Sequence, residues 1–311
     1  MGRRIGLLIF IVFSLVCLWP PISGAAQITD ASGRVVTFDK PFSRIVSLYS
    51  AHTDNLLAMG AGEALIGASK GHEVGDIPRF SYHDGTERFL AARPDLVLIR
   101  PMIERGYGRL VSSLRARGIT VISLQPGTVA EMMDYWVALG KLSGHEAEAR
   151  SMVSTFEKET QRIQGLTQGM HEKRTVFFEA MHAKLRTFSK ESMAAWALGL
   201  AGGVNAAEDA VPSKGSNIAI YGKERLLAKG ASIDVYLVQQ GRMNRVTREQ
   251  IEKEPGFSLI RAVRDGKIYF VDEALVSRPT PALLEGVRRI GQLLYPTLFE
   301  TTTEGLAVHG Q

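Results

Sequence analysis

Residues 143–166 read SGHEAEARSMVSTFEKETQRIQGL, the longest helical pattern in this chain. Six of its residues recur at spacings of three and four, which places them on one face of a helix. They are Ala149, Met152, Val153, Phe156, Thr160 and Ile163. Ser143 and Glu146 stand three residues apart, so we expect a capping box where this helix begins. At 1.5 Å per residue the helix is about 30 Å long, which suits a rigid connector.

Short β-type runs alternate with helical patterns on both sides of this segment. They precede it at residues 44–49, 65–69, 95–100 and 120–124, and follow it at 175–180, 234–239 and 267–271. Such alternation predicts an α/β fold with largely parallel sheets. We therefore expect two α/β lobes joined by one long α-helix, with a ligand-binding cleft between the lobes. The alternative is an ordinary surface helix within one larger domain.

The two flanks also resemble each other. The helical segment ERFLA (87–91) precedes the apolar run DLVL (95–98), and ERLLA (224–228) precedes DVYL (234–237). Each pair is followed by another unit of helix, glycine and strand. A repeat of this kind indicates two lobes of similar architecture.

The first residues are typical of a cleaved signal peptide. Arg3 and Arg4 form a positive region, residues 5–19 are apolar, and residues 23–25 are small. The rest of the 311-residue chain is long enough for two domains of about 130 residues. We predict these segments: signal peptide 1–25, N-terminal α/β lobe 26–143, connecting helix 144–168, C-terminal α/β lobe 169–300 and flexible tail 301–311.

Removal of the signal peptide also removes Cys17, the one cysteine of the chain. Val16 is not the small residue that a lipoprotein signal needs before its cysteine, so we expect a soluble mature protein in the periplasm. That protein would have no disulfide and no cysteine-based metal site. Removal of Arg3 and Arg4 lowers the formal charge from +5 to +3. A surplus of that size is too small for a nucleic-acid-binding surface.

Enzymatic and bare-metal sites have little support in the sequence. The histidines form no His-x3-His or HExxH pair, although His52, His83 and His182 offer a weaker alternative in which they converge on a metal. No Gly-x-Ser-x-Gly elbow follows a strand. Gly60-Ala61-Gly62 lacks the third glycine of a dinucleotide fingerprint, and more simply ends a helix that begins near His52. A secreted α/β hydrolytic enzyme is kept as the alternative from another functional class.

In parallel α/β sheets, ligands meet the loops that follow the carboxyl ends of the strands. Those loops, with the loop before the helix at 87–91, supply these ligand-binding candidates: Tyr49, His52, Tyr82, His83, Arg100, Met102, His182, Arg242 and Arg278. Arginines offer forked donors for carboxylate, phosphate or catecholate oxygens, and aromatic rings offer flat apolar surface. For Met102 and the neighbouring Met181, packing in the core is an equal alternative.

Several short motifs resemble the iron-chelate and vitamin B12 periplasmic binding proteins of ABC importers. The resemblance covers residues 44–296 and rests on RIVSL (44–48), GAGEALIG (60–67), RPDLVL (93–98), AGGVN (201–205), VRDGKIY (263–269) and SRP (277–279). It implies a class III periplasmic-binding fold, with the Fe/B12-binding domain at about 44–300. The chain departs from the family pattern at Thr53-Asp54, where Thr-Glu is usual.

The resemblance also implies a function. The protein would capture a metal chelate, either a ferric siderophore or a corrinoid such as cobalamin, and deliver it to an ABC permease dimer in the inner membrane. Haem or a metal oxyanion is the alternative cargo within the same class. A monomer is expected, with no catalytic residue, no resident cofactor or metal, and no nucleic-acid partner.

Two glutamates would contact the permease. In the family one acidic residue on each lobe engages permease arginines, and the matching positions here are Glu87 and Glu224. The alternative is helix capping, since Asp84 and Glu87 have the spacing of a capping box. No capping residue stands three positions before Glu224, where the chain has Tyr221.

Overall fold

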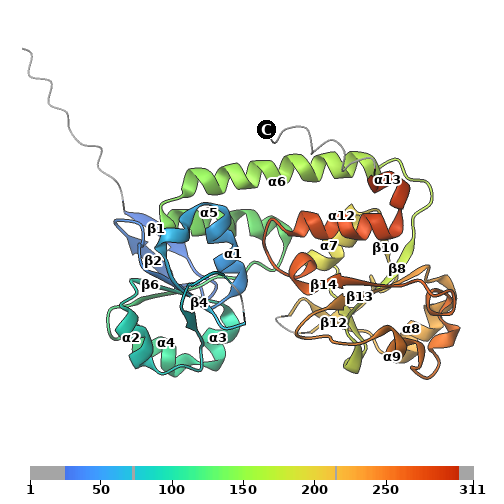
Figure 1. Cartoon of the computed structure of the whole chain (residues 1–311), viewed down its shortest axis with the longest axis horizontal. Helices are drawn as coiled ribbons and strands as arrows, with labels where there is room; N and C mark the ends of the chain where they lie inside the picture. The colour runs from blue at the N-terminus through green and yellow to red at the C-terminus, as the bar shows by residue number, and fades with distance from the viewer. Residues whose placement is uncertain (1–24, 72–73, 214–215, 301–311) are drawn as a thin grey trace, which may run out of the picture.

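Figure 1 shows a computed structural model of the chain, which describes residues 25–71, 74–213 and 216–300. Two lobes lie side by side beneath one long helix, α6 (Glu146–Thr167), which runs across both. The predicted tail and all but the last residue of the predicted signal peptide, with Cys17, lie outside the described residues. Within those residues no helix combines the length and apolar composition needed to cross a bilayer.

The N-lobe runs from β1 to α5 and contains an all-parallel sheet with strand order β5-β4-β3-β6-β7. Its strands are β3 (Ile45–Ser47), β4 (Leu65–Ser69), β5 (Arg79–Phe80), β6 (Leu96–Ile99) and β7 (Thr120–Ser123). A separate antiparallel hairpin, β1 (Ala26–Thr29) and β2 (Val35–Phe38), precedes them. The helices are α1 (Ser50–Ala58), α2 (Thr86–Ala92), α3 (Pro101–Gly106), α4 (Gly108–Arg115) and α5 (Val129–Ser143).

The C-lobe runs from β8 to α13 and contains a mixed sheet with strand order β11-β12-β9-β8-β13-β14, in which β10 also pairs with β8. The parallel strands are β8 (Thr175–Met181), β10 (Val204–Asn205), β13 (Val235–Gln240) and β14 (Ile268–Asp272). An antiparallel edge is formed by β9 (Arg186–Phe188), β11 (Val211–Pro212) and β12 (Ile218–Ile220). The helices are α7 (Met193–Leu200), α8 (Lys223–Lys229), α9 (Arg248–Glu252), α10 (Arg261–Arg264), α11 (Glu273–Val276), α12 (Leu283–Leu294) and α13 (Pro296–Glu300).

Helices cover both faces of each sheet. In Figure 1, α1, α5, α7 and α12 lie on the side of the sheets toward α6, and α2, α3, α4, α8 and α9 lie on the other side. Strands covered on both faces read as continuous apolar runs, and all four residues of β6 are buried. The predicted two-lobed α/β fold with largely parallel sheets is confirmed.

Side chains alternate between the two faces of each sheet along the central strands, and the buried apolar side chains form three separate clusters. On β6, Leu96 and Leu98 face the helices beneath α6, and Val97 and Ile99 face the opposite helices. On β13, residues 235 and 237 face α6 in the same way, and 236 and 238 face away. The two faces toward α6 belong to one continuous apolar core, whereas each lobe has a separate core on its far side.

The predicted apolar face of α6 is the buried one. Ala149, Phe156 and Ile163 are buried, and the ring of Phe156 lies between two tryptophans. Trp136 of α5 meets it edge-on with ring centroids 5.3 Å apart, and Trp196 of α7 stacks on it at 5.7 Å. Because Trp136 belongs to the N-lobe and Trp196 to the C-lobe, α6 packs against both.

The predicted capping box at Ser143 and Glu146 is wrong. Ser143 is the last residue of α5, and its hydroxyl donates to the carbonyl of Leu139 at 2.9 Å. Gly144, with a left-handed φ of 79°, ends α5, and α6 begins after His145 without a side-chain cap. A serine inside a helix bonds back to the carbonyl four residues earlier, so this hydroxyl is not available to the next helix.

Candidate functional site

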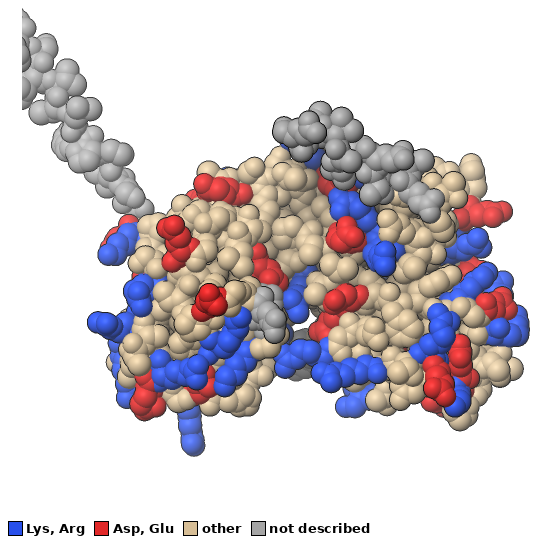
Figure 2. Space-filling view, in the orientation of Figure 1, with Lys and Arg blue, Asp and Glu red and all other residues tan. Residues whose placement is uncertain are grey.

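The lobes meet through the loops that follow their parallel strands. Gly71 follows β4, and a Cβ added to it would lie 3.3 Å from Nη1 of Arg242, which follows β13. Asp54 of α1 pairs with Arg278, in the segment after α11, at 3.5 Å. The space-filling view shows a hollow between the lobes, with Lys and Arg side chains near its lower edge (Figure 2). The predicted cleft therefore has residues of both lobes on its walls.

Tyr49 occupies the N-lobe side of this meeting point. The guanidinium carbon of Arg100 lies 4.9 Å from the centre of its ring, a cation–π contact. Burial raises the pKa of the Tyr49 phenol, and the positive charges of Arg100 and Arg278 oppose that rise. Tyr49, Arg100 and Arg278, three of the predicted ligand-binding residues, are thus brought together by two lobes.

The segment that carries Arg278 is anchored on the N-lobe by its next residue. The carbonyl of Pro279 accepts hydrogen bonds from Asn55 Nδ2 at 2.8 Å and from Trp136 Nε1 at 3.0 Å. Asn55 and Trp136 were not among the predicted site residues, because neither follows a strand. The motif Ser277-Arg278-Pro279 was the signal in the sequence for this segment.

His52 lies in the core of the N-lobe and not on the cleft surface. Its side chain is fully buried, between the rings of Tyr49 (5.2 Å) and Tyr135 (5.7 Å), with Nε2 at 2.9 Å from the carbonyl of Leu124. Burial lowers the pKa of His52 from 6.5 to about 4, so the ring is neutral at physiological pH. The structure therefore gives its predicted role in ligand binding no geometric support.

An aromatic cluster, with His83 exposed and two half-buried tyrosines, lies elsewhere on the carboxyl edge of the N-lobe sheet. The rings of Tyr82 and Tyr107 are 4.6 Å apart, and His83 packs on both. The hydroxyl of Tyr107 lies 3.3 Å from Nε2 of His83. Tyr107 follows the short helix α3, so a rule based on the residue directly after each strand missed it. Met102 is half-buried and packs against the N-lobe core, in line with the alternative reading as core.

His182 follows β8 and belongs to a polar network in the C-lobe. Glu179, fully buried, accepts from Tyr236 Oη at 2.5 Å and Asn244 Nδ2 at 3.0 Å, and lies 2.8 Å from His182 Nδ1. The hydrogen bond with Glu179 raises the pKa of His182. The imidazole of His182 is therefore hydrogen-bonded to a residue of its own lobe.

The structure does not bring the three histidines of the bare-metal alternative together. His52 is in the N-lobe core, His83 is exposed beside Tyr107, and His182 is held by Glu179. Across the part of the chain that the structure describes, no group of three or more His, Cys, Asp or Glu side chains is placed to hold a metal ion.

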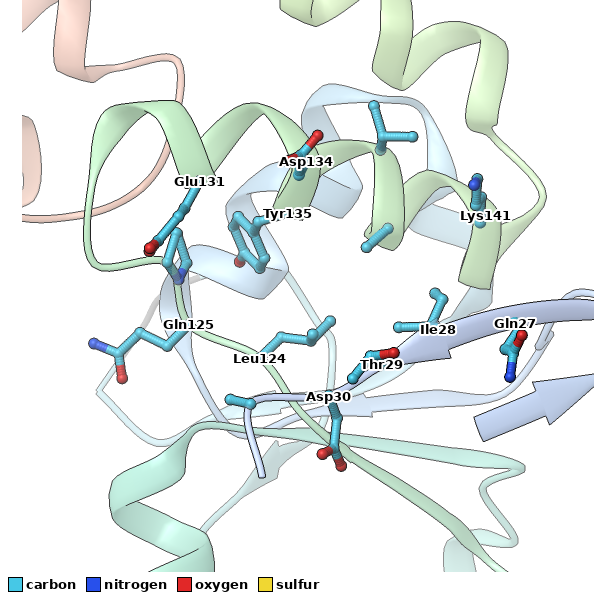
Figure 3. A pocket seen from close by; sticks show the side chains of 14 residues that line it. Gln27, Ile28, Thr29, Asp30, Leu124, Gln125, Glu131, Asp134, Tyr135 and Lys141 are labelled. Carbon is cyan, nitrogen blue, oxygen red and sulfur yellow. The ribbon is translucent and has the colours of Figure 1, made fainter. Parts of the chain in front are cut away.

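The C-lobe and the N-lobe each have an open pocket. One, of about 470 Å³, lies at the carboxyl ends of β13 and β14 and is lined by Arg242 and Arg245 among others. The other, of about 410 Å³, lies between β1 and α5 of the N-lobe. Figure 3 shows Ile28, Leu124 and Tyr135 around this second pocket, which none of the predicted ligand-binding residues lines.

Glu87 and Glu224 occupy equivalent places in the two lobes. Each is exposed in the first turn of a short helix, α2 or α8, that begins after a glycine. Neither carboxylate has an ion-pair partner among the described residues. The capping box considered for Glu87 is wrong, since Gly85 is the N-cap and Asp84 accepts from the backbone of Ser81 at 2.8 Å. Both helices lie on the side of the molecule away from α6 (Figure 1).

Comparisons with known proteins agree with this architecture. An uncharacterized ABC transporter substrate-binding lipoprotein of Bacillus subtilis (strain 168) is 26% identical over 287 residues, covering 88% of this chain and 86% of that protein. The crystal structure of a possible iron-binding periplasmic solute-binding protein from Staphylococcus epidermidis has a TM-score of 0.71 at 25% identity. It covers 82% of this chain and 100% of its own.

A more distant likeness concerns the fold alone. The periplasmic haem-binding protein of Vibrio cholerae has a TM-score of 0.70 at 19% identity, covering 81% of this chain and 99% of its own. The sequence profile of the periplasmic binding protein family matches residues 45–275, most of the chain. With two lobes beneath one connecting helix and a cleft between them, this chain belongs to the periplasmic binding protein family.

Proposed function

We propose that this protein is the substrate-binding component of an ABC importer, located in the periplasm, and that its cargo is a metal chelate. The observation that carries the proposal is the meeting of Tyr49, Arg100 and Arg278 between the lobes. A ligand held there contacts both lobes at once, which is how a two-lobed carrier can sense that it is loaded. The Bacillus subtilis relative bears the same description as an ABC transporter substrate-binding protein.

The chemistry of this cluster favours an anionic ligand with an apolar surface. A guanidinium offers five N–H donors in a fixed geometry that matches carboxylate, phosphate or catecholate oxygens. Tyr49 adds an aromatic face beside the two arginines. A ferric siderophore or a corrinoid presents both kinds of surface, and the Staphylococcus epidermidis neighbour is described as possibly iron-binding.

Haem is the second candidate cargo, and one observation favours it. Tyr82, His83 and Tyr107 form a partly exposed cluster in which a phenol and an imidazole are in contact. Both groups are suitable axial ligands for haem iron. The cluster also offers flat rings against which a planar macrocycle can pack.

The test is a binding panel with the purified mature chain. A ferric tris-catecholate, a ferric tris-hydroxamate, cyanocobalamin and haemin are added separately, and binding is followed by tryptophan fluorescence and by the absorption band of each ligand. We expect one chelate to bind one molecule of protein without chemical change. Failure of all four ligands to bind would exclude the proposed cargo class. Turnover of an ester or nucleotide substrate would favour the hydrolytic alternative.

We also propose that Glu87 and Glu224 dock the loaded protein on the two halves of a permease dimer. Their exposure, their position on different lobes and their lack of ion-pair partners among the described residues support this role. Charges at the rim of an interface set orientation and association rate more than they set the affinity of a distant site. Transport should therefore need both glutamates, whereas ligand affinity should need neither.

The docking proposal is tested with the double variant Glu87→Ala/Glu224→Ala. We expect cells to lose uptake while the purified variant binds ligand normally and keeps its melting temperature. The matched control is Glu63→Ala/Glu191→Ala, which removes one exposed glutamate from each lobe at other positions. Normal uptake by the first double variant would refute docking, and a shared loss of uptake in both would show a general effect of charge.

A further inference from the structure

The loop after β13 carries two arginines on the C-lobe side of the cleft. Arg242 and Arg245 line the pocket of about 470 Å³ together with Gln240, Gly241, Phe270, Val271 and Asp272. The pocket lies where β13 and β14 end as parallel neighbours, with residues 240 and 272 in register. Ligands of parallel α/β sheets bind at such carboxyl ends.

Both arginine residues are exposed. Among the described residues neither Arg242 nor Arg245 forms an ion pair, whereas Arg225 and Arg261 in the same lobe are paired with Asp209 and Asp234. The carboxylates nearest the pocket are already hydrogen-bonded to backbone. Asp272 accepts from the N–H of Ala274 at 2.7 Å, and Glu273 accepts from the N–H of Met243 at 3.4 Å.

Two contacts relate the strand ends at this pocket to the segment of Arg278 and to the N-lobe. Gln239 at the end of β13 accepts a hydrogen bond from Ser277, the residue before Arg278. On the other side, a Cβ added to Gly71 of the N-lobe would lie 3.3 Å from Nη1 of Arg242. Arg242 therefore stands at the boundary between the lobes, and Arg245 lies on the same loop.

We propose that this pocket is a second subsite of the cleft, in which Arg242 and Arg245 bind a carboxylate, phosphate or other oxyanionic group of the cargo. The inference rests on the proposed function, and it narrows the cargo to a polyanionic chelate. Half-buried Phe270 supplies an apolar wall beside the charged group. The charged residues that line the pocket are two arginines and Asp272, so recognition depends on direct contact with the guanidiniums more than on a long-range field, which salt screens.

The first test uses inorganic pyrophosphate as the probe and isothermal titration as the measurement. We expect the unliganded protein to bind it, and Arg242→Gln/Arg245→Gln to weaken binding at least tenfold. The control is Lys158→Gln/Arg289→Gln, which removes the same charge from exposed positions outside the pocket and should leave affinity unchanged. The subsite is overturned if the unchanged protein does not bind pyrophosphate, or if the control weakens binding equally.

The second test separates a cargo group from a free anion. The same variants are titrated with a trianionic ferric tris-catecholate and with an uncharged ferric tris-hydroxamate. We expect Arg242→Gln/Arg245→Gln to weaken the anionic chelate at least tenfold and the uncharged one by less than threefold. If only pyrophosphate binding is lost, the pocket serves a free anion and its place in the cargo site is overturned. If the unchanged protein binds neither chelate, the proposed cargo class fails while the pyrophosphate titration still decides the subsite.

Discussion

The N-lobe and the C-lobe each place a largely parallel sheet between helices, yet the polar groups buried on α1 of the one and on β8 of the other differ in charge. The N-lobe buries neutral groups on one face of α1, with His52, Thr53 and Asn55 all inaccessible. The C-lobe buries the carboxylate of Glu179, surrounded by Tyr236, Asn244 and His182. The same architecture therefore accepts neutral polar groups beside a central strand of one lobe and a carboxylate on a central strand of the other, while a second buried carboxylate, Asp30, lies in the β1–β2 hairpin of the N-lobe.

The difference between the lobes follows from which segments the internal repeat includes. The repeated units at residues 87 and 224 define a helix followed by a buried strand, and the structure has both units in equivalent places. The loops after the strands and the antiparallel edge of the C-lobe are not repeated. The repeated helix–strand units thus give the two lobes similar layers of helix and sheet. The loops and edge strands that are not repeated give the two lobes different binding surfaces.

The strongest test of the comparison removes the buried charge. Glu179→Ala should lower the free energy of unfolding by about 3–5 kcal/mol, because it leaves buried donors and His182 without their acceptor. Urea denaturation measures the change. The control Glu191→Ala, exposed in the same lobe, should stay within about 0.5 kcal/mol. A loss below about 1 kcal/mol for Glu179→Ala would mean that the network adds little to the C-lobe.

The next test compares the two walls of the cleft. Arg278→Ala and Arg100→Ala should each weaken an anionic chelate at least tenfold, since a hydrogen bond to a charged group contributes about 1.5–3 kcal/mol. Arg289→Ala, exposed on α12, is the matched control. A change of less than threefold for one of the first two variants would place that arginine outside the pocket. The chelate would then be held by an arginine of one lobe only.

The third test uses pH to examine the neutral groups buried on α1 of the N-lobe. The pKa of His52 is 6.5 when unfolded and about 4 when folded, so acid protonates the unfolded chain first. The stability that depends on a neutral His52 is complete above pH 6.5 and is lost as the pH falls toward 4. Linkage gives a loss of about 2 kcal/mol between pH 7 and pH 5. Urea denaturation at both pH values should show a correspondingly smaller loss for His52→Gln; an unchanged slope would contradict the assignment.

The smallest effect is expected from His182, with the opposite sign. Glu179 raises the folded pKa of His182 above 6.5, so its stabilising charge is present below that pH. The contribution is lost as the pH rises through the raised value. His182→Gln should therefore lose less stability than the unchanged protein when the pH is raised from 6 to 9. Equal losses would mean that the imidazole is not charged in the folded C-lobe.

The regular elements were predictable because their patterns are local. The run at residues 65–69 is β4, and the spacing of apolar residues in 146–167 matches the buried face of α6. The antiparallel strands β9, β11 and β12 were not predicted, because two or three residues are too few to show a period. The capping box at Ser143 failed because the same serine completes the preceding helix.

The candidate site was less predictable, because burial depends on tertiary packing. His52 is one helical turn from Tyr49, yet it turns into the core while Tyr49 lies under Arg100. Arg245 was missed because it stands several residues beyond the end of β13. Glu179 did have a signal, since a carboxylate inside the apolar run 175–181 requires buried partners. The identity of those partners depends on residues more than fifty positions away.

The continuous core beneath α6 has a consequence for how the molecule folds. Residues of both sheets and of α6 bury their side chains in that one core, so neither lobe can lose its structure without exposing apolar surface of the other. Elements that share a core unfold as one cooperative unit. The chain therefore has two lobes for ligand binding but unfolds as one cooperative unit. Its packing predicts a single unfolding transition.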